Sequence, residues 1–354
     1  MKITFLKAFN GDSIHLCYND KKGEIINILI DGGPSNNYTF KDKNSGKIID
    51  GDLKIIIEKI KPQKINLLIL THIDDDHIDG FLKWFSNDEE AGDLIEEIWF
   101  NSGNSIKKYF KNIKEEIDSI KFKEKTTLTS VKQGTDFEKY VKDKGIWDEK
   151  IIKKDDPINW KDLTFKILSP DDEQLEKLLK EWKNKAPESL LETSRKGNYN
   201  MTLKEIFDED KFDEDSDPFN GSSIAFILEK DEFNYLFLGD SHSSVVIQEL
   251  KKLGFDENNK LKIELVKLSH HGSKKNNPIE LFKLIDTNKY IISTNGDQHG
   301  HPDKDSIARI VSTNPKAEIY FNYPNLISRI ILQEDIKDFP CVTFLSTESL
   351  QQNI

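Results

Sequence analysis

The sequence predicts an α/β protein whose strands and helices alternate in two halves and pack as a layered sandwich. Short apolar runs of strand length recur along the chain, as at residues 24–30, 65–70 and 233–238, and stretches with helical spacing of apolar residues lie between them. Many of these runs stop at a glycine turn or at a group of His and Asp residues. In α/β folds, polar residues at the ends of buried strands commonly line the functional groove.

Each element of the first half has its own signal. Apolar residues on both sides of Asn10-Gly11-Asp12 predict two short strands joined by a turn within residues 2–16. Continuous apolar runs predict buried strands after this turn, and apolar side chains at helical spacing predict the helices between them. In order, we expect a strand at 24–30, a helix at 52–60, a strand at 65–70, a helix at 80–85 and a strand at 96–100.

The middle and the second half follow the same signals. In order, we expect helices at 105–120 and 136–143, a strand at 163–168, a helix at 173–182, strands at 222–229 and 233–238, a helix at 244–253, a strand at 262–268, a helix at 278–284, a strand at 290–294 and a helix at 307–312. Two or three short strands should close the chain. Residues 208–217 carry seven carboxylates, a run that repels itself and is expected to be solvated. A calcium loop is the alternative there, but the glycine and ligand spacing of an EF-hand are absent.

The composition limits the class of protein. The chain has 354 residues, a formal net charge of -12 and 36% hydrophobic residues, enough for a packed core. The acidic balance argues against a broad phosphate-binding surface, although a metal site could still hold one phosphate. No apolar run approaches the roughly 20 residues of a membrane helix, and residues 1–12 lack the apolar stretch of a secretory signal. Two distant cysteines without a CxxC pair fit the cytoplasmic location that we expect.

The histidines gather at strand ends. Of eight histidines, all except His15 lie in a loop that follows a predicted buried strand. Polar residues at several strand ends converge on one groove when the strands lie side by side. The histidines in such loops are His72, His77, His242, His270, His271, His299 and His301, and the same positions carry Asp31, Asp74, Asp76 and Asp240.

The segment from His72 to His77 is the centre of the predicted site. Imidazole nitrogen and carboxylate oxygen are ligands that zinc and manganese accept. Residues two apart leaving a strand point the same way, so His72 and Asp74 can hold one ion while Asp76 and His77 face a second. Asp240 can bridge two cations, which also relieves repulsion among the carboxylates. Each motif alone is more often a hydrogen-bonded loop, but ligand-type residues at five strand ends together favour one or two divalent ions, zinc or manganese.

Together these motifs resemble the metallo-β-lactamase fold superfamily, and most of all its ComEC-like hydrolase branch. The matching residues, in order, are Asp31, His72-x-Asp74-x-Asp76-His77, Gly239-Asp240, His270-His271-Gly272-Ser273 and Gly300-His301-Pro302. The resemblance implies a four-layer αββα sandwich formed by a single domain over residues 1–354. Insertions around 101–160 and 183–217 carry no motif of the family.

One feature of the family is missing. Members with two zinc ions usually supply a histidine between the Asp-His and Gly-Asp motifs, and none occurs here between His77 and His242. A carboxylate, a water or a late histidine is then expected to fill the first metal position. Alternatively, one ion is held by Asp76, His77, Asp240 and one C-terminal histidine. Asp74 favours manganese, or another ion that accepts oxygen ligands, somewhat over zinc.

The resemblance also implies individual roles. His271 is expected as a metal ligand, and His301 as the alternative ligand or as the group that protonates a substrate oxygen. Asp31 is expected to orient a ligating histidine, and the loop containing Ser273 to hold an oxyanion. His270 either packs inward or replaces His271.

The remaining charged groups receive simpler expectations. Asp76 or Asp240 accepts a proton and orients the attacking water. His242 and His299 are expected to be solvated loop residues, and His15 to be structural. Lys267 either neutralises a phosphate or points to solvent.

The predicted function is therefore a metal-dependent hydrolase that uses metal-activated water. A phosphodiesterase or nuclease, with nucleic acid or another phosphodiester as substrate, is the first expectation because the ComEC-like branch is associated with DNA processing. Hydrolysis of a small-molecule ester, amide or thioester is the alternative. A third reading is a non-catalytic subunit with a protein partner, as in a phage-defence system. No association with a membrane is expected.

Overall fold

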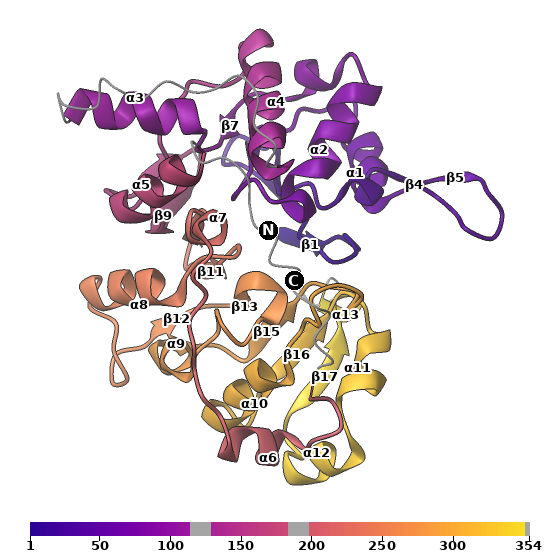
Figure 1. The fold of residues 1–354 in the computed structure, drawn as a ribbon, viewed down its shortest axis with the longest axis vertical. Helices are drawn as coiled ribbons and strands as arrows, with labels where there is room; N and C mark the ends of the chain where they lie inside the picture. The colour runs from indigo at the N-terminus through magenta and orange to yellow at the C-terminus, as the bar shows by residue number, and fades with distance from the viewer. Residues whose placement is uncertain (114–128, 183–197, 351–354) are drawn as a thin grey trace.

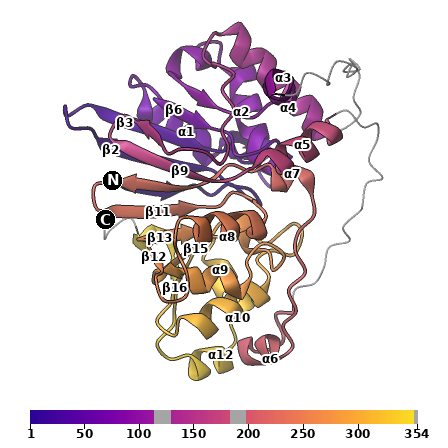
Figure 2. The same ribbon diagram turned by 90° about the vertical axis from the view of Figure 1, so that its left-hand side faces the viewer.

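Two β-sheets pack face to face and carry helices on both outer faces (Figure 1). The computed structural model describes residues 1–113, 129–182 and 198–350. In the view of Figure 2 the two sheets lie between the helices of the N-terminal half and those of the C-terminal half. The order helix, sheet, sheet, helix confirms the predicted four-layer αββα sandwich.

The first sheet has the strand order β1-β2-β3-β6-β7. The first three strands form an antiparallel meander, and the last two run parallel to β3. Helices α1 to α5 cover its outer face around a core that includes Phe81, Trp84 and Phe137. The bounds are β1 Lys2–Phe5, β2 Ile14–Asn19, β3 Ile25–Ile30, β6 Leu67–Ile69, β7 Ile98–Trp99, α1 Asp52–Ile60, α2 Asp75–Asn87, α3 Gly103–Ile113, α4 Thr129–Asp143 and α5 Asp172–Glu181.

The second sheet has the strand order β17-β16-β15-β13-β11-β10-β9-β8. Strands β8 to β11 are antiparallel, and β11 then leads into parallel strands that alternate with helices. Its strands are β8 Ile158–Trp160, β9 Leu163–Ser169, β10 Ala225–Lys230, β11 Phe233–Phe237, β13 Leu265–Lys267, β15 Lys289–Ile292, β16 Glu318–Phe321 and β17 Thr343–Ser346. Its helices and the small strands beside it are α6 Leu203–Asp208, α7 Pro218–Gly221, α8 Ser243–Lys252, β12 Leu261–Lys262, α9 Ile279–Leu284, β14 Ile285–Asp286, α10 Lys304–Thr313, α11 Asn325–Ile330, α12 Gln333–Asp338 and α13 Thr347–Leu350.

The sheets meet through a shared apolar layer. Alternate residues of each strand face this layer, such as Ile28 and Leu67 from the first sheet and Phe165 and Phe226 from the second. Each large apolar side chain buried in this way contributes about 1.5–3 kcal/mol relative to exposure. Since the strands of both sheets are fixed by one core, the loops at their ends are held in fixed positions relative to each other.

Several elements differ from the sequence-based predictions. Helix α2 begins at Asp75, five residues before the predicted start, so His77 lies in a helix and not in a loop. The chain does not close on strands alone, because α11, α12 and α13 also follow α10. These helices have four or six residues, too few for a helical period to show in the sequence. Residues 114–120 of the predicted helix at 105–120 lie outside the described residues.

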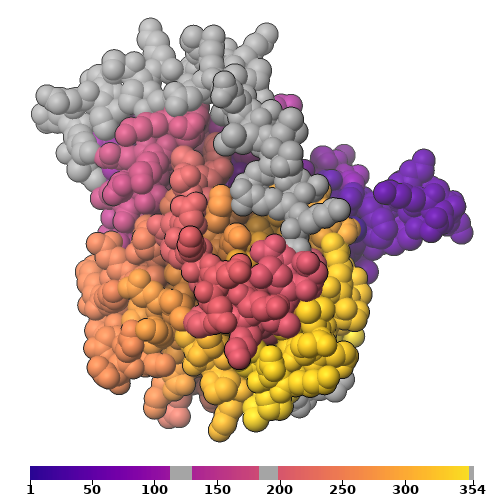
Figure 3. Space-filling view, turned by 60° about the horizontal axis from the view of Figure 1, so that its bottom comes forward, coloured from indigo at the N-terminus to yellow at the C-terminus, as the bar shows by residue number. Residues whose placement is uncertain are grey.

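A projecting hairpin was not predicted at all. It consists of β4 (Thr39–Lys41) and β5 (Ile48–Asp50), and it extends from the N-terminal half in Figure 3. Cys17 and Cys341 are both free. Among the described residues, no helix is long and apolar enough to span a membrane.

Candidate metal centre

The predicted site residues are carried by loops at the ends of strands from both sheets. His72 follows β6 of the first sheet, whereas Asp240 follows β11 of the second. His270 and His271 lie in the 3-10 turn Ser269–Gly272, directly after β13. The site therefore lies where the two sheets meet, and the order of the sheet strands brings together residues that are far apart in the sequence.

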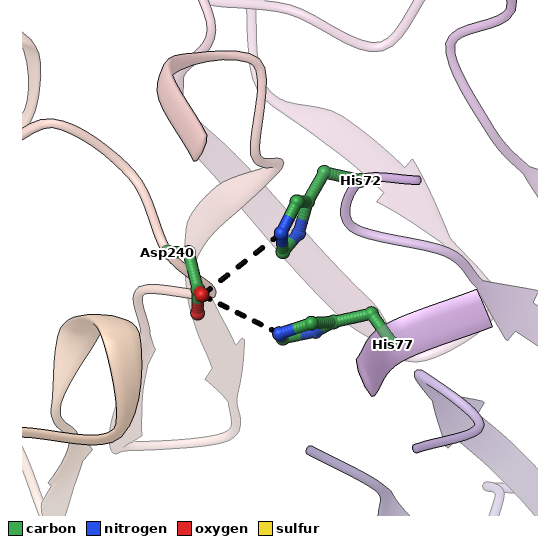
Figure 4. Close-up of side chains that lie close together, drawn as sticks. All are labelled: His72, His77 and Asp240. Atoms are coloured by element: carbon green, nitrogen blue, oxygen red, sulfur yellow. Dashed lines mark ion pairs between the residues drawn. The ribbon is translucent and has the colours of Figure 1, made fainter. Parts of the chain in front are cut away.

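Four imidazoles surround one carboxylate oxygen. The Oδ2 atom of Asp240 lies 3.4 Å from His77 Nε2, 3.7 Å from His271 Nε2, 3.8 Å from His270 Nε2 and 3.9 Å from His72 Nε2. Figure 4 shows His72 and His77 pointing toward Asp240. Two ligands of one tetrahedral zinc ion are roughly 3.3 Å apart, given metal–ligand bonds of about 2.0–2.2 Å. The observed separations fit donors that share cations.

The donor atoms themselves are buried and unpaired. His72 Nε2, His77 Nε2, His271 Nε2 and Asp240 Oδ1 have no hydrogen-bond partner. A buried polar atom without a partner costs about 1–3 kcal/mol, so several in one place indicate a missing ligand. The donor set, imidazole nitrogen with carboxylate oxygen, fits a borderline divalent cation.

The opposite nitrogen of each ring is held by the protein. His77 Nδ1 lies 2.9 Å from Asp31 Oδ2, and His271 Nδ1 lies 2.9 Å from the Ser293 carbonyl oxygen. His72 Nδ1 lies 3.1 Å from Thr71 Oγ1. Partners of this kind fix the tautomer and the ring direction of metal-binding histidines. Asp31 thus lies against the candidate ligand His77, and the orienting role expected for it stays a prediction.

The His-x-Asp-x-Asp-His segment separates into two groups. Asp74 Oδ2 lies 3.6 Å from His72 Nε2 on one side. On the other side, Asp76 Oδ2 lies 3.2 Å from His271 Nε2, and Asp76 Oδ1 lies 3.9 Å from His77 Nε2. Asp240 is shared by both groups. The division between a first and a second ion stays a prediction.

The backbone is strained at the same place. His270 and His271 have φ values of 47° and 54°, and Gly272 continues the left-handed path with a φ of 87°. Asp31 also has a positive φ, 57°. Left-handed residues other than glycine cost of order 1–3 kcal/mol and cluster at functional sites. Here the strain turns both histidine side chains into the cluster.

The carboxylates and imidazoles stabilise each other's charges. Burial lowers the pKa of His271, but the carboxylates of Asp240 and Asp12 outweigh burial and raise the pKa to about 10. The pKa of His270 is raised to about 9, again against burial, mainly by Asp240 and Asp215. Conversely, burial raises the pKa of Asp240, yet the neighbouring imidazoles hold it well below its usual value. A bound cation would take the place of the imidazole protons.

The turn between β1 and β2 contacts the candidate ligand His271 through Asp12, a contact that was not predicted. Asp12 Oδ1 lies 3.3 Å from His271 Nδ1, and Asp12 Oδ2 accepts a hydrogen bond from the ammonium of Lys267. Lys267 is 1% exposed, so the expectation that it faces solvent or a phosphate is wrong. The lysine is needed inside because a buried Asp12 carboxylate requires a counter-charge. The turn signal Asn10-Gly11-Asp12 was visible in the sequence, but its long-range partner was not.

A cavity of about 500 Å³ opens onto the cluster. It is lined by Asp74, Asp76 and Asp240 together with His270, Ser273 and His301. The Nδ1 atom of His301 lies 3.5 Å from Asp303 Oδ2, and burial lowers the pKa of His301. Ser273 is buried, and its Oγ accepts a hydrogen bond from the Lys275 amide at 3.2 Å. The candidate substrate-contacting residues therefore share one cavity with the candidate ligands.

Residues 208–217, here called the acidic strap, also reach this cavity. Most of the strap is exposed, as predicted, but Asp210, Glu214 and Asp215 are half-buried. The Asp210 carboxylate accepts hydrogen bonds of 2.8 and 2.6 Å from the buried guanidinium of Arg309. Glu214 accepts from the Ser244 amide at 2.6 Å. Attraction to these donors holds Asp210 and Glu214 against the C-terminal half, where Figure 3 shows the strap in rose.

The other histidines lie outside the cluster. His242 is buried and donates through Nε2 to the Asp217 carbonyl oxygen at 2.9 Å, so its predicted solvent exposure is wrong. His15 lies within β2, where its Nε2 is 3.0 Å from Asn27 Oδ1, in agreement with a structural role. His299 lines the cavity and is exposed.

Comparisons with known proteins give structural similarity only. No protein-family model and no curated protein matches the chain. Among solved structures, the metallo-β-lactamase fold protein YhfI from Bacillus subtilis aligns at 10% identity and a TM-score of 0.40, covering 97% of this chain and 95% of that chain. A protein from Parabacteroides distasonis assigned as a metal-dependent hydrolase aligns at 13% identity and a TM-score of 0.33, covering 96% of each chain.

A third similar structure belongs to another chemistry. The diiron β-hydroxylase CmlA from Streptomyces venezuelae aligns at 9% identity and a TM-score of 0.41, covering 98% of this chain and 52% of that chain. At these identities and TM-scores, similarity says nothing about the activity of this chain. None of the three is described as ComEC-like, and that resemblance stays a prediction.

Proposed function

We propose that this protein is a metal-dependent hydrolase that cleaves phosphodiester bonds. The observation that carries the proposal is the set of buried, unpaired Nε2 atoms of His72, His77 and His271 around the Asp240 carboxylate. Asp74 and Asp76 add oxygen donors on the two sides of this set. When bound there, a divalent ion supplies a water of lowered pKa and stabilises negative charge that develops on a substrate oxygen.

Residues of the cavity support the rest of the reaction. His301 has a pKa lowered by burial, so its imidazole is neutral at pH 7 and can accept a proton or pass one on. The Asp303 carboxylate lies 3.5 Å from His301 Nδ1 and offers it a nearby negative charge. Lys274 and Lys275 line the same cavity and offer positive charge to the non-bridging oxygens of a phosphate.

A second candidate is hydrolysis of a small-molecule ester, amide or thioester. The cavity that favours it is lined by six aspartates, namely Asp74, Asp76, Asp215, Asp217, Asp240 and Asp303, against two lysines. Such a wall disfavours a long polyanion more than a small neutral ester. A nucleic acid could bind here only if bound cations offset the charge of these carboxylates.

The test measures hydrolysis with manganese or zinc present. Wild-type protein should cleave bis-p-nitrophenyl phosphate, and single-stranded DNA reports on the nuclease reading. The variant Asp76→Asn should lose more than the roughly 10–100-fold that is typical when an outer partner of a metal site is removed. Asp75→Asn is the matched control, because Asp75 is exposed and has Asp79 and Gln133 as its main neighbours, with weaker repulsion from Asp74 and Asp76.

Three results would contradict the proposal. Equal phosphodiester cleavage by wild type and Asp76→Asn would show that the activity does not come from this centre. Turnover of nitrocefin or a thioester without phosphodiester cleavage would favour the second candidate. Metal binding without hydrolysis of any of these substrates would favour a non-catalytic subunit with a protein partner.

A further inference from the structure

Of the four imidazoles around Asp240, His270 alone belongs neither to the group of His72 and Asp74 nor to the group of Asp76, His77 and His271. Its Nε2 lies 3.8 Å from Asp240 Oδ2, and the corresponding distance for His72 is 3.9 Å. The second group already has Asp76, His77 and His271 next to Asp240. The first group has His72 and Asp74 beside the shared carboxylate; His77 also lies close to His72 and Asp240, but its Nε2 can bind only one of two ions. A cation between them would lack a fourth protein donor.

The orientation of His270 is set from its outer side. His270 Nδ1 lies 3.1 Å from Asn276 Oδ1 and 3.5 Å from Asp215 Oδ2. Both are oxygen atoms, so they favour a proton on Nδ1 and leave the lone pair of Nε2 directed toward Asp240. This is the arrangement that orients a metal-binding histidine. Asn220 Nδ2 also lies 3.5 Å from His270 Nδ1, but its shorter contact is the 2.7 Å hydrogen bond that it donates to Asp215.

The acidic strap provides this support. The Asp215 carboxylate accepts hydrogen bonds from Asn220 Nδ2 at 2.7 Å and from Asn276 Nδ2 at 3.2 Å, so its position is fixed from two further segments. The strap itself is anchored through Asp210 to the fully buried Arg309. The left-handed backbone of His270, with a φ of 47°, turns the ring toward this support.

We propose that His270 is the fourth protein ligand of a first divalent-cation position formed by His72, Asp74 and Asp240, and that Asp215 of the acidic strap is its positioning residue. The proposal rests on the cation site of the proposed function and deepens it. The chain then holds two cations that share Asp240, although it has no histidine between His77 and His242. The late histidine pair supplies one ligand to each position.

The experiment counts cations and does not depend on turnover. Purified protein is dialysed against manganese or zinc at pH 7.5, and bound metal is measured by elemental analysis. Wild type should bind two equivalents, and His270→Asn should bind one, because asparagine tolerates a left-handed backbone but is too short to reach the position. His270→Gly removes every side-chain donor and should also bind one. The ion retained by the second position shows that each variant is folded.

Two further variants separate ligand from positioning residue. Asp215→Asn should keep two equivalents but weaken the first by about 10–100-fold. His299→Ala, which alters an exposed histidine of the same cavity, should bind two ions with wild-type affinity. Two equivalents with unchanged affinity in both His270 variants would overturn the proposal, as would a single equivalent in wild type.

This outcome is separable from that of the proposed function. If wild type binds two ions through His270 and hydrolyses nothing, the proposed hydrolase fails and the ligand assignment holds. If wild type hydrolyses phosphodiesters with one equivalent bound, the hydrolase stands and the first cation position does not exist.

Discussion

Asp12 connects two buried groups that would each be unfavourable alone. Asp12 is 2% exposed. One carboxylate oxygen accepts a hydrogen bond from the Lys267 ammonium, and the other lies 3.3 Å from His271 Nδ1. Burial raises the pKa of Asp12, but Lys267 and His271 outweigh burial and lower it to about 2. The pair therefore neutralises charge inside the protein while directing a candidate ligand.

Removing the lysine should destabilise the protein strongly. Lys267→Met leaves the Asp12 carboxylate buried without its cation, and breaking a buried pair costs about 3–5 kcal/mol in the free energy of unfolding. Urea unfolding followed by circular dichroism measures this loss. The control Lys262→Met changes an exposed lysine of the neighbouring segment and should cost little. Equal losses in the two variants would show that the buried pair is not special.

His15 should make the free energy of unfolding depend on pH in the mildly acidic range. Burial lowers its pKa, despite the hydrogen bond to Asn27. Since the unfolded chain has the ordinary pKa of about 6.5, the unfolded state binds more protons below that value. The contribution of His15 is therefore present above about pH 6.5 and is lost as the pH falls below it. His15→Gln should have a flatter free energy of unfolding than wild type between pH 6.5 and 5; identical slopes would contradict this assignment.

The candidate metal ligands could be predicted from sequence, because each lies in a short motif, whereas their buried partners could not. The positions of His72, Asp74, Asp76, His77 and Asp240 after apolar runs predict them as ligands, and the family resemblance adds His271. The structure brings all six into one cluster. Asp12 and Lys267 are 255 positions apart, and no local pattern marks a lysine as buried. His242 was likewise misplaced because its partner is a backbone carbonyl of the acidic strap. Contacts between distant segments depend on the packing of the two sheets.

At the scale of elements, the β1–β2 turn packs closely against the start of α2 and forms hydrogen bonds with it. The Asp12 amide donates to the Asp76 carbonyl oxygen at 3.2 Å, and Asn10 Nδ2 donates to Asp76 Oδ2 at 3.3 Å. Gly11 lies so close that an added Cβ would be 1.9 Å from the Asp76 carbonyl oxygen. The turn therefore fixes the position of a candidate ligand through its backbone.

Gly11→Ala should lower the affinity for a divalent cation. The added methyl group must push the turn away from Asp76, which moves the carboxylate relative to His271. We expect at least a 10-fold loss of affinity for manganese, comparable to the loss of an outer partner. Gly23→Ala is the control, because Gly23 has a φ of 84° and no neighbour within 4 Å. It should cost about 1–2 kcal/mol of stability, because alanine disfavours a left-handed backbone, and leave the affinity unchanged, as measured by equilibrium dialysis.

Elements were predictable where a regular pattern was long enough. Helix α1 was predicted with its observed bounds because three buried residues, Leu53, Ile57 and Ile60, repeat along one face. The sequence pattern did not predict the start of α2, because its first turn, Asp75 to His77, is polar and lacks the apolar residues that mark a helix packed on the core. The six-residue helices α11 and α12 span fewer than two turns, so packing and not periodicity determines them.

At the scale of the whole molecule, the cluster joins the two sheets as well as their loops. His72 and His77 belong to the first half, and Asp240, His270 and His271 to the second. A cation bound between them adds contacts that the unfolded chain cannot make. Binding at 100 times the dissociation constant should stabilise the fold by about 2.7 kcal/mol. Melting curves with and without a chelator measure this gain, and Asp240→Asn should abolish it; an unchanged melting temperature in wild type would contradict it.

Cation affinity should increase steeply with pH. The pKa of His270 is raised to about 9 and that of His271 to about 10, so both rings carry a proton at pH 7 and must lose it to a cation. Each displaced proton raises the affinity about 10-fold per pH unit below these pKa values. Calorimetric titration with manganese between pH 6 and 8 should show this slope, together with proton release that depends on the buffer. His271→Asn should lower the number of protons released by one. An affinity independent of pH in this range would mean that the raised pKa values do not describe the groups that the cation meets.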